Sequence, residues 1–254
     1  MGPIEMRRVS KLFRIPHEKR TTLFSVVGGL LLGKHQTFED FWALRDISLA
    51  VGEGEVLGVV GRNGSGKSTL LRIIGNIYQP TSGTVSVRGR IIPFIELGVG
   101  FQDELSGREN VYLYGSILGL PKRVIDANYK AIVEFAELKD FMDLPLKDYS
   151  SGMNLRLAFA TATIAEPDVI LIDEVLAVGD AEFQKKCLDK MEDFKRRSRA
   201  IVFVSHDAAQ VKRLCSRAVL LSHGREHACG EPSEVLAGYA RLASKEEKGT
   251  RATR

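Results

Sequence analysis

The sequence EVLGVVGRNGSGKSTLL, residues 55–71, joins an apolar run to a glycine-rich turn and then to a helical pattern. The run at residues 55–61 is almost continuously apolar, as expected of a strand buried on both faces of a parallel sheet. Glycines in the turn allow successive backbone N–H groups to point inward, and the N-terminus of the following helix adds its dipole. The stretch therefore predicts an anion site built from a strand, a loop and a helix.

The turn, residues 61–68, matches the pattern GxxxxGK[ST] and is called the P-loop below. In this pattern Lys67 reaches the β- and γ-phosphates of a nucleotide, and the Ser68 hydroxyl ligates Mg²⁺. The predicted nucleotide-binding residues here are Gly61, Arg62, Asn63, Gly64, Ser65, Gly66, Lys67, Ser68 and Thr69.

A second buried-strand pattern, DVILIDE at residues 168–174, ends in two carboxylates. A carboxylate at the carboxyl end of a neighbouring strand supplies the second protein contact to Mg²⁺, directly or through water, and this predicts Asp173 as a metal ligand. Glu174 points to the other face and is the predicted catalytic residue that polarises the attacking water.

The remaining pattern places the chain in the α/β class. Residues 200–207, AIVFVSHD, form a further buried strand, and the helical residues 181–197 between the two strands predict that these strands are parallel. Residues 81–96 predict short antiparallel strands joined by turns, and residues 218–230 a hairpin. Residues 106–166 are helical in pattern.

Composition fits a globular protein and excludes several other classes. The chain has 254 residues, 44% of them hydrophobic and 27% charged, so it can bury a substantial core. Its net charge of +4 is not clustered as in nucleic-acid-binding proteins, so no nucleic-acid partner is predicted. Three scattered cysteines indicate reduced thiols in a cytosolic protein. The apolar run at residues 23–33 is about half the ~20 residues that a membrane-spanning helix needs.

Several motifs occur in the order of one known family. The P-loop, Ser150-Ser151-Gly152, Asp173-Glu174, Asp180 and His206 follow roughly the spacing of ABC-transporter nucleotide-binding domains, which the sequence resembles over residues 4–242. The resemblance implies a RecA-like P-loop NTPase core with a parallel sheet, an antiparallel β subdomain and an ABC helical subdomain at about residues 105–166. Residues 1–242 would form this domain, and residues 243–254 a polar basic tail or linker stub.

The resemblance also implies roles for residues far from the P-loop. Two domains would sandwich two ATP molecules as a homodimer, with Mg²⁺ as the second cofactor. Ser150, Ser151 and Gly152 would be the family's signature, whose serine and backbone N–H groups face the γ-phosphate bound to the other subunit. Asp180 would be the aspartate that follows the catalytic strand, and His206 the catalytic histidine that senses the γ-phosphate.

The signature departs from the common LSGGQ form. Tyr149 replaces leucine, Ser151 replaces the first glycine, and Met153 replaces glutamine. With DEVLAVGDAEFQKKC after the catalytic strand and ELGVGFQDELSGRENVYL, this form is similar to that of ATPases that export lipid-linked polysaccharides. These include exporters of O-antigen, capsule and teichoic acid, with O-antigen the first expectation.

Two site residues are less sharply specified by the sequence. Counting back from ELSGREN places Glu96 or Leu97 at the position of the family's Q-loop glutamine, and Glu96 is predicted to assist Mg²⁺ binding through its carboxylate oxygens. The adenine needs an aromatic platform near the end of the first strand, for which Phe13 is the first candidate and Trp42 the second.

Residues 14–41 form an insertion where typical ABC ATPases have a short hairpin. The segment carries basic residues and the apolar run at residues 23–33, so it predicts either a docking element for a membrane partner or anionic lipid-linked substrate, or a loop folded onto its own domain.

The sequence therefore predicts an energy-coupling ATPase that hydrolyses ATP at the cytoplasmic face of the inner membrane. It would be bound peripherally to two copies of a separate transmembrane permease that moves the lipid-linked polysaccharide. The alternatives are the ATPase of a drug or small-molecule ABC transporter, and a non-transport ABC ATPase. The second of these fits less well, because such proteins carry long coiled-coil insertions or two fused ATPase domains.

Overall fold

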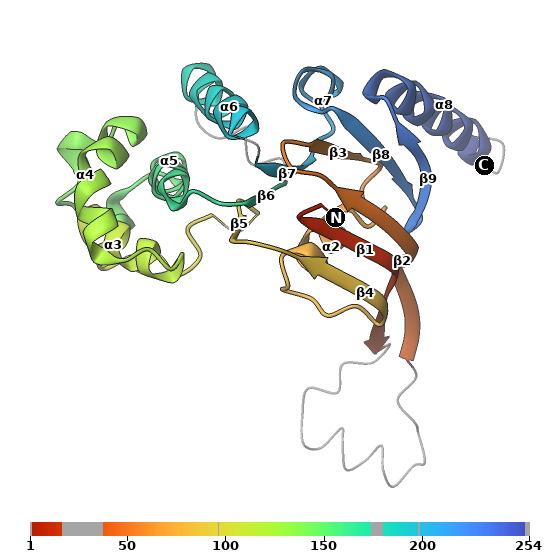
Figure 1. Ribbon diagram of the computed structural model, residues 1–254, viewed down its shortest axis with the longest axis horizontal. Helices are drawn as coiled ribbons and strands as arrows, with labels where there is room; N and C mark the ends of the chain where they lie inside the picture. The colour runs from red at the N-terminus through yellow and green to blue at the C-terminus, as the bar shows by residue number, and fades with distance from the viewer. Residues whose placement is uncertain (1, 17–37, 96, 174–179, 198, 252–254) are drawn as a thin grey trace, which may run out of the picture.

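Two β-sheets with one helix between them form the centre of the molecule (Figure 1). The computed structural model describes residues 2–16, 38–95, 97–173, 180–197 and 199–251. The larger sheet has six strands in the order β5-β6-β7-β3-β8-β9. These strands are β3 (Val56–Val60), β5 (Ile91–Pro93), β6 (Val169–Asp173), β7 (Ala200–Val204), β8 (Arg217–Ser222) and β9 (Arg225–Gly230).

The larger sheet is parallel from β5 to β8, and β9 joins β8 as an antiparallel hairpin. Both faces of its central strands are buried, which explains their continuous apolar sequences. In β3, for example, Val56 and Val60 pack into the core on one face, while Leu57 and Val59 pack into the core on the other. The prediction that the strands at residues 168–174 and 200–207 are parallel is confirmed, since β6 pairs with β7 in parallel.

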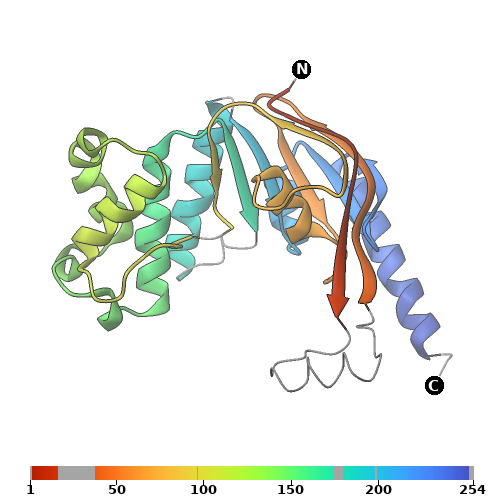
Figure 2. The same ribbon diagram turned by 90° about the horizontal axis from the view of Figure 1, so that it is seen from below.

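The smaller sheet is antiparallel, with strand order β2-β1-β4. Its strands are β1 (Ile4–Pro16), β2 (Phe38–Val51) and β4 (Ser82–Val87). β4 pairs with β1 only as far as Ser10, so beyond that point β1 and β2 continue as a two-stranded ribbon. Figure 2 shows this ribbon extending away from the larger sheet.

One sequence prediction for these strands is wrong. Residues 81–96 do not form antiparallel strands with each other, because β4 pairs with β1 in the smaller sheet and β5 pairs in parallel with β6 in the larger one. The turn between them carries the chain from one sheet to the other. The short apolar runs specify strands but not the partners of those strands.

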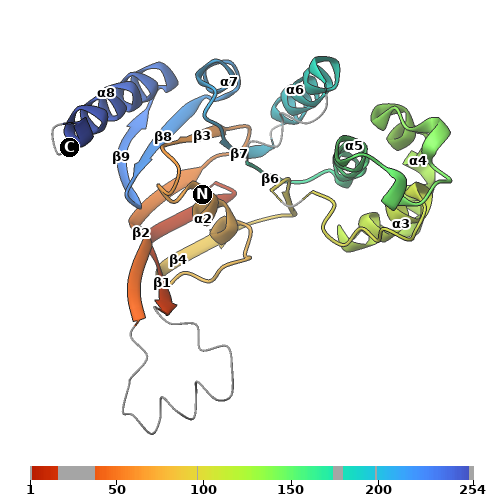
Figure 3. The same cartoon turned by 180° about the vertical axis from the view of Figure 1, so that it is seen from behind.

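Helices cover the larger sheet and form a separate subdomain. α2 (Lys67–Ile74) lies between the two sheets and buries Leu70, Leu71, Ile73 and Ile74 there. The helices α6 (Ala181–Arg196), α7 (Ala208–Leu214) and α8 (Pro232–Arg251) lie across the opposite face, as Figure 3 shows from behind.

The second group of helices forms the helical subdomain. It contains α3 (Gly107–Ile117), α4 (Lys122–Ala136) and α5 (Ser151–Ala162), with short 3₁₀ turns at Lys139–Phe141, Leu146–Asp148 and Thr163–Ala165. Figure 2 places it at the left end of the molecule, apart from the β1–β2 ribbon. The expected boundary at residue 242 is not the end of an element, because α8 continues to Arg251. Within the described ranges, no helix is both long and apolar enough to span a bilayer.

Candidate functional site

The carboxyl edge of the larger sheet brings together motifs that are far apart in sequence. The P-loop follows β3, Asp173 ends β6, and His206 follows β7, which lies between those two strands. The register pairs Asp173 with Val204, the last residue of β7. Because parallel strands end at the same edge of a sheet, the three motifs lie at that edge.

The P-loop forms one wall of a cavity of about 510 Å³, a size typical of ligand sites. Its lining residues are Phe41, Ala43, Asn63, Gly64, Gly66, Lys67, Ser68, Thr69 and Asp173. Gly66 is required at its position, because its φ of 105° is in the region that favours glycine. A side chain there would also lie 2.5 Å from the Ala43 carbonyl oxygen.

Lys67 is held in the cavity wall by the loop itself. Its Nζ donates hydrogen bonds of 2.8 and 3.0 Å to the carbonyl oxygens of Gly61 and Arg62. The residue is only 8% exposed, so its ammonium group is desolvated on most sides and presented to the cavity. A cation in this setting binds a phosphate more strongly than an exposed lysine does.

Ser68 and Asp173 form a pair of oxygen donors beside Lys67. The Ser68 hydroxyl donates a 2.9 Å hydrogen bond to Asp173 Oδ2, although the residues lie 105 positions apart. Two adjacent ligands of octahedral Mg²⁺, each ~2.0–2.1 Å from the ion, are about 2.9 Å from each other. The spacing and the oxygen chemistry of this pair therefore fit Mg²⁺.

The rear of the P-loop is fixed by the turn between β8 and β9. Gly224 N–H donates to the Ser65 carbonyl at 3.1 Å, and the Gly224 carbonyl accepts from Arg45 N–H of β2 at 2.7 Å. Ser65 is buried, and Arg62, Ser65 and residues of this turn line a second cavity behind the loop. The P-loop is thus connected to both sheets by backbone hydrogen bonds.

The aromatic residue at the cavity is not one of the two predicted candidates. Phe41 on β2 lines the cavity and is 46% exposed. Phe13 pairs with Phe41 across the ribbon, but its ring packs edge-on against Tyr78, with the ring centroids 5.6 Å apart. Trp42 lies next along β2, where the Arg45 guanidinium is 5.7 Å from its ring centroid. The geometry favours Phe41 as the platform for a base.

His206 is exposed and is held by a short turn between β7 and α7. The Ser205 hydroxyl accepts from Asp207 N–H at 3.0 Å, and Asp207 in turn caps α7 by accepting from Ala209 N–H. The two flanking residues fix the backbone, so the imidazole lies at the carboxyl edge of the sheet, on the strand between the P-loop and Asp173.

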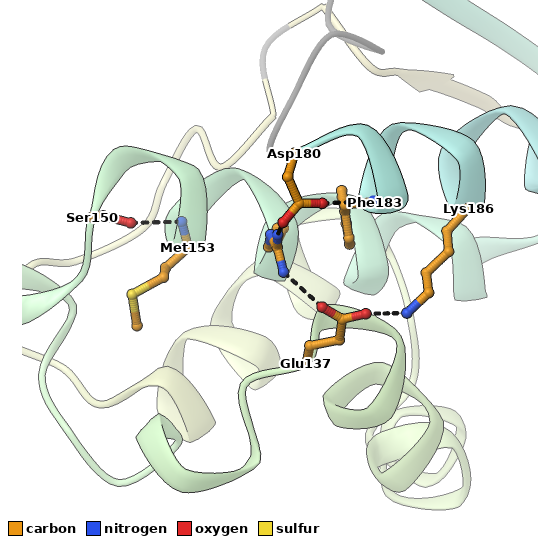
Figure 4. Close-up of polar contacts among 7 residues, drawn as sticks. Glu137, Ser150, Met153, Asp180, Phe183 and Lys186 are labelled. Carbon is orange, nitrogen blue, oxygen red and sulfur yellow. Dashed lines mark hydrogen bonds and ion pairs between the residues drawn. The ribbon is translucent and has the colours of Figure 1, made fainter.

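The predicted signature forms the N-terminus of α5, in the helical subdomain. Ser150 is the N-cap residue, and its hydroxyl accepts from Met153 N–H at 3.2 Å (Figure 4). Ser151 is exposed and Gly152 half-buried, so the first backbone N–H groups of the helix lie near the surface. Among the described residues that line the P-loop cavity there is none from α5.

Tyr149 explains how the unusual signature is accommodated. Its hydroxyl donates a 2.7 Å hydrogen bond to the Phe141 carbonyl, and burial raises its pKa to about 12. A Cβ atom at Gly107 would lie 2.2 Å from this hydroxyl oxygen, so the phenol fills the space that a glycine leaves at the start of α3. The tyrosine therefore anchors the residue directly before the Ser150 cap.

Asp180 contacts the signature helix of its own chain. Its Oδ1 caps α6 by accepting from Phe183 N–H at 2.9 Å, and its Oδ2 accepts from Arg156 of α5 at 2.6 Å (Figure 4). The cap bond first, and then the nearby guanidinium, lower the pKa of this carboxyl group. Arg156 also donates to Glu137 at 2.8 Å.

Several predictions lie outside the described residues. Glu174, Glu96 and most of the insertion (residues 17–37) are in this group, so their predicted roles stay predictions. Sequence reasoning missed Phe41 and Arg156. A signal existed for Phe41, since Phe38, Phe41 and Trp42 cluster in one strand, but Arg156 appears in the sequence as an ordinary polar residue of an amphipathic helix.

Comparison with known proteins gives a consistent family. A family model described as ABC transporter matches residues 44–177. The chain is 45% identical over 248 residues to the O-antigen export system ATP-binding protein RfbB of Myxococcus xanthus, covering 96% of this chain and 57% of that protein. It is 43% identical over 199 residues to the RfbB protein of Klebsiella pneumoniae, covering 78% of this chain and 81% of the relative. The teichoic acids export ATP-binding protein TagH of Listeria innocua is 40% identical over 236 residues, covering 93% and 69%.

Solved structures share the fold at lower identity. An ATP-binding subunit of an ABC transporter superposes with a TM-score of 0.74 at 21% identity, over the whole of both chains. A dimeric ATP-binding cassette in a post-hydrolysis state with ADP and Pi superposes with a TM-score of 0.71 at 22% identity, over 90% of this chain and 98% of that one. The predicted α/β P-loop NTPase fold is confirmed. By its family match and its relatives, the chain belongs to the ABC transporter family.

Proposed function

We propose that this chain is the ATP-binding and ATP-hydrolysing subunit of an ABC transporter that exports a lipid-linked polysaccharide. The observation that carries the ATPase part is the Ser68–Asp173 hydrogen bond of 2.9 Å beside the buried ammonium group of Lys67. The relatives named for O-antigen export support O-antigen as the cargo, and those named for teichoic acid export make that polymer the second candidate. The chain spans 57% of the length of the Myxococcus relative. The proposed cargo therefore rests on the names of the relatives and describes the whole transporter.

In this proposal the P-loop binds the phosphates of ATP through backbone N–H groups and Lys67. Ser68 and Asp173 hold Mg²⁺, which when bound neutralises charge on the β- and γ-phosphates. Glu174 directly follows Asp173 in the sequence and is proposed to polarise the attacking water. His206, at the end of the strand between the other two motifs, is proposed to contact the γ-phosphate.

The signature is proposed to act on nucleotide held by a second copy of the chain. The N-terminus of α5 offers backbone N–H groups and the Ser150 hydroxyl near the surface, which suits an anion. Because α5 contributes nothing to the lining of its own P-loop cavity, its anion is proposed to be the γ-phosphate of the partner's ATP. Each active site would then need two chains.

The proposed assembly is a homodimer bound peripherally to two copies of a transmembrane permease at the cytoplasmic face of the membrane. Closure of the dimer around ATP and its opening after hydrolysis would drive the permease. This proposal follows from the relatives, which are named as ATP-binding proteins of export systems.

A mixing experiment tests the composite site. Lys67→Ala removes the side-chain cation of the P-loop, and Ser150→Arg blocks the signature while leaving the P-loop of the same chain intact. Each homodimer should lack ATP hydrolysis, and Ser150→Arg should still bind ATP. A mixture can form one intact site from the P-loop of one chain and the signature of the other, so it should recover part of the activity. Normal hydrolysis by the Ser150→Arg homodimer would reject the assignment of the signature.

The cargo is tested by export in cells. The chain, expressed with its cognate membrane subunit in an O-antigen exporter deletion strain, should restore O-antigen at the cell surface. The Lys67→Ala variant is the matched control, because it leaves the fold and the partner surface in place. Restored export of a different polymer would keep the ATPase assignment and reject O-antigen.

A further inference from the structure

A cluster of charged residues connects the helical subdomain to the start of α6. This group, called here the Arg156 cluster, consists of the charged residues Glu137, Arg156, Asp180 and Lys186 together with the ring of Phe183. Figure 4 labels Glu137 at the end of α4 and Asp180, Phe183 and Lys186 at the start of α6, and Arg156 of α5 contacts Glu137 and Asp180. Nothing in the nucleotide site described above uses Glu137 or Lys186.

Arg156 contacts three groups at once. One guanidinium nitrogen donates to Glu137 at 2.8 Å, and the other donates to Asp180 at 2.6 Å. The guanidinium carbon lies 4.8 Å from the centre of the Phe183 ring, and the Arg156 side chain is only 16% exposed. The planar fork of arginine can satisfy two carboxylates and stack on a ring together, which lysine cannot do.

Glu137 occupies an unusual backbone position for this purpose. It is the residue after α4, with a φ of 59° and a ψ of 38°, a left-handed conformation usually taken by glycine or asparagine at helix ends. A glutamate in this conformation carries a backbone cost. One oxygen accepts from Arg156 and the other pairs with Lys186 of α6. The lysine first, and then the arginine, lower the pKa of the Glu137 carboxyl group.

Asp180 connects the signature helix α5 to the start of α6. Both of its oxygens are used, one to cap α6 and one to bind Arg156. Arg156 lies six positions after the Ser150 cap on the same helix, about 9 Å along its axis. Asp180 in turn lies seven positions after Asp173, the last residue of β6. The α5 helix and the Arg156–Asp180 ion pair therefore join the signature to the N-terminus of α6.

We propose that Arg156 is a positioning residue that makes the signature helix and the N-terminus of α6 move as one unit. This inference rests on the proposed action of the signature on the partner's nucleotide. In such a dimer the signature of one chain serves one active site, while Asp173 of the same chain serves the other. Arg156 therefore couples the two active sites, and ATP hydrolysis depends cooperatively on ATP concentration.

The test compares ATP hydrolysis by the wild type and two variants, each with the full chain and its cognate membrane subunit. Arg156→Lys retains the charge but loses the planar fork that reaches both carboxylates while stacking on the Phe183 ring. It should lower kcat about tenfold, within the range of coupling effects, and reduce the Hill coefficient for ATP from above 1 toward 1. The dissociation constant for ATP should stay within about twofold, because the P-loop is intact.

The second variant separates positioning from a loss of stability. Glu137→Gly removes the carboxylate and places the residue that the backbone prefers, so the melting temperature should be unchanged or higher while the Hill coefficient falls as in Arg156→Lys. The matched control is Arg213→Lys, since Arg213 of α7 donates hydrogen bonds of 2.8 and 3.0 Å to one oxygen of Glu192 on α6, away from the signature helix. The control should keep the wild-type kcat and Hill coefficient.

Three results would overturn the inference: a wild-type Hill coefficient of 1, an unchanged Hill coefficient in both variants, or a lower kcat with an unchanged Hill coefficient. Ser150→Arg in the same assay separates this failure from failure of the proposed function. If Ser150→Arg hydrolyses ATP normally, the composite site itself is rejected. If Ser150→Arg is inactive and Arg156→Lys behaves as the wild type, only the role of Arg156 is rejected.

Discussion

Replacing Gly224 by alanine should destabilise the protein and weaken nucleotide binding together. Gly224 has a φ of 73°, and a non-glycine residue in the left-handed region costs about 1 kcal/mol. The new Cβ would lie 2.7 Å from the Ala43 carbonyl oxygen and 3.0 Å from its carbon, and these are backbone atoms that cannot rotate away. The β8–β9 turn must therefore move away from β2.

This movement weakens two backbone hydrogen bonds, from Arg45 to Gly224 at 2.7 Å and from Gly224 to Ser65 at 3.1 Å. Each contributes about 1 kcal/mol net, and the entropy lost from the unfolded chain offsets ~0.4–1 kcal/mol. The expected loss in the free energy of unfolding is thus about 2–3 kcal/mol. The bond to Ser65 supports the P-loop, so losing its ~1 kcal/mol should raise the Kd for ATP about fivefold.

Urea denaturation and ATP titration measure the two effects. Gly230→Ala is the matched control, because its added Cβ would meet no atom within 4 Å and its φ is outside the region that favours glycine. This control should change the free energy of unfolding by less than ~1 kcal/mol and leave the Kd unchanged. If Gly224→Ala is as stable as the control and binds ATP as tightly as the wild type, the turn does not support the P-loop.

Two further predictions concern the base platform and the thiols. Phe41→Ala should raise the Kd for ATP about tenfold, because stacking on an aromatic ring contributes ~1–3 kcal/mol per base. Phe13→Ala should change the Kd less than about twofold. Competition with a fluorescent ATP analogue measures both, and the reverse order would restore Phe13 as the platform. A disulfide reagent at pH 8 should rapidly label only Cys229 in the folded protein, because Cys187 and Cys215 are buried. Burial raises the pKa of each of these two thiols to about 12, so at pH 8 only about one in ten thousand of them is the reactive thiolate. Three labelled thiols in native buffer, as expected in urea, would contradict the buried positions.

The sequence was sufficient wherever the structure depends on neighbouring residues. Residues a few positions apart specify the apolar strands that precede the P-loop and end at Asp173. The same holds for the N-cap at Ser150 and the helix from Lys122. Such local patterns limit a segment to one element and one position in it.

Pairing over long distances was harder to predict. β4 and β5 are both short strands, and only their partners, β1 and β6, assign them to different sheets. The register between β1 and β2 shifts between Lys11 and Leu12, which no local pattern indicates. The position of Phe41 beside the P-loop depends on that register.

Arg156 was missed for the same physical reason. Its partners Glu137 and Asp180 lie 19 and 24 positions away, on either side of α5 in the sequence. An arginine in an amphipathic helix is usually a solvated residue, and only the packing of α4, α5 and α6 brings the two carboxylates to it. Its importance is a property of the assembled fold.

The long β1–β2 ribbon also makes this chain convenient to engineer. The strands remain paired as far as Pro16 and Phe38, and opposed residues of an antiparallel pair have Cα atoms ~4.5–5.5 Å apart. A guest sequence placed between these two residues therefore begins and ends at neighbouring points, and the entropy of closing such a loop grows only slowly with its length. A small fluorescent domain could replace residues 17–37 without a change to either strand. Since Phe41 lies on the same ribbon, three positions beyond Phe38, such a fusion would place an optical label close to the nucleotide cavity.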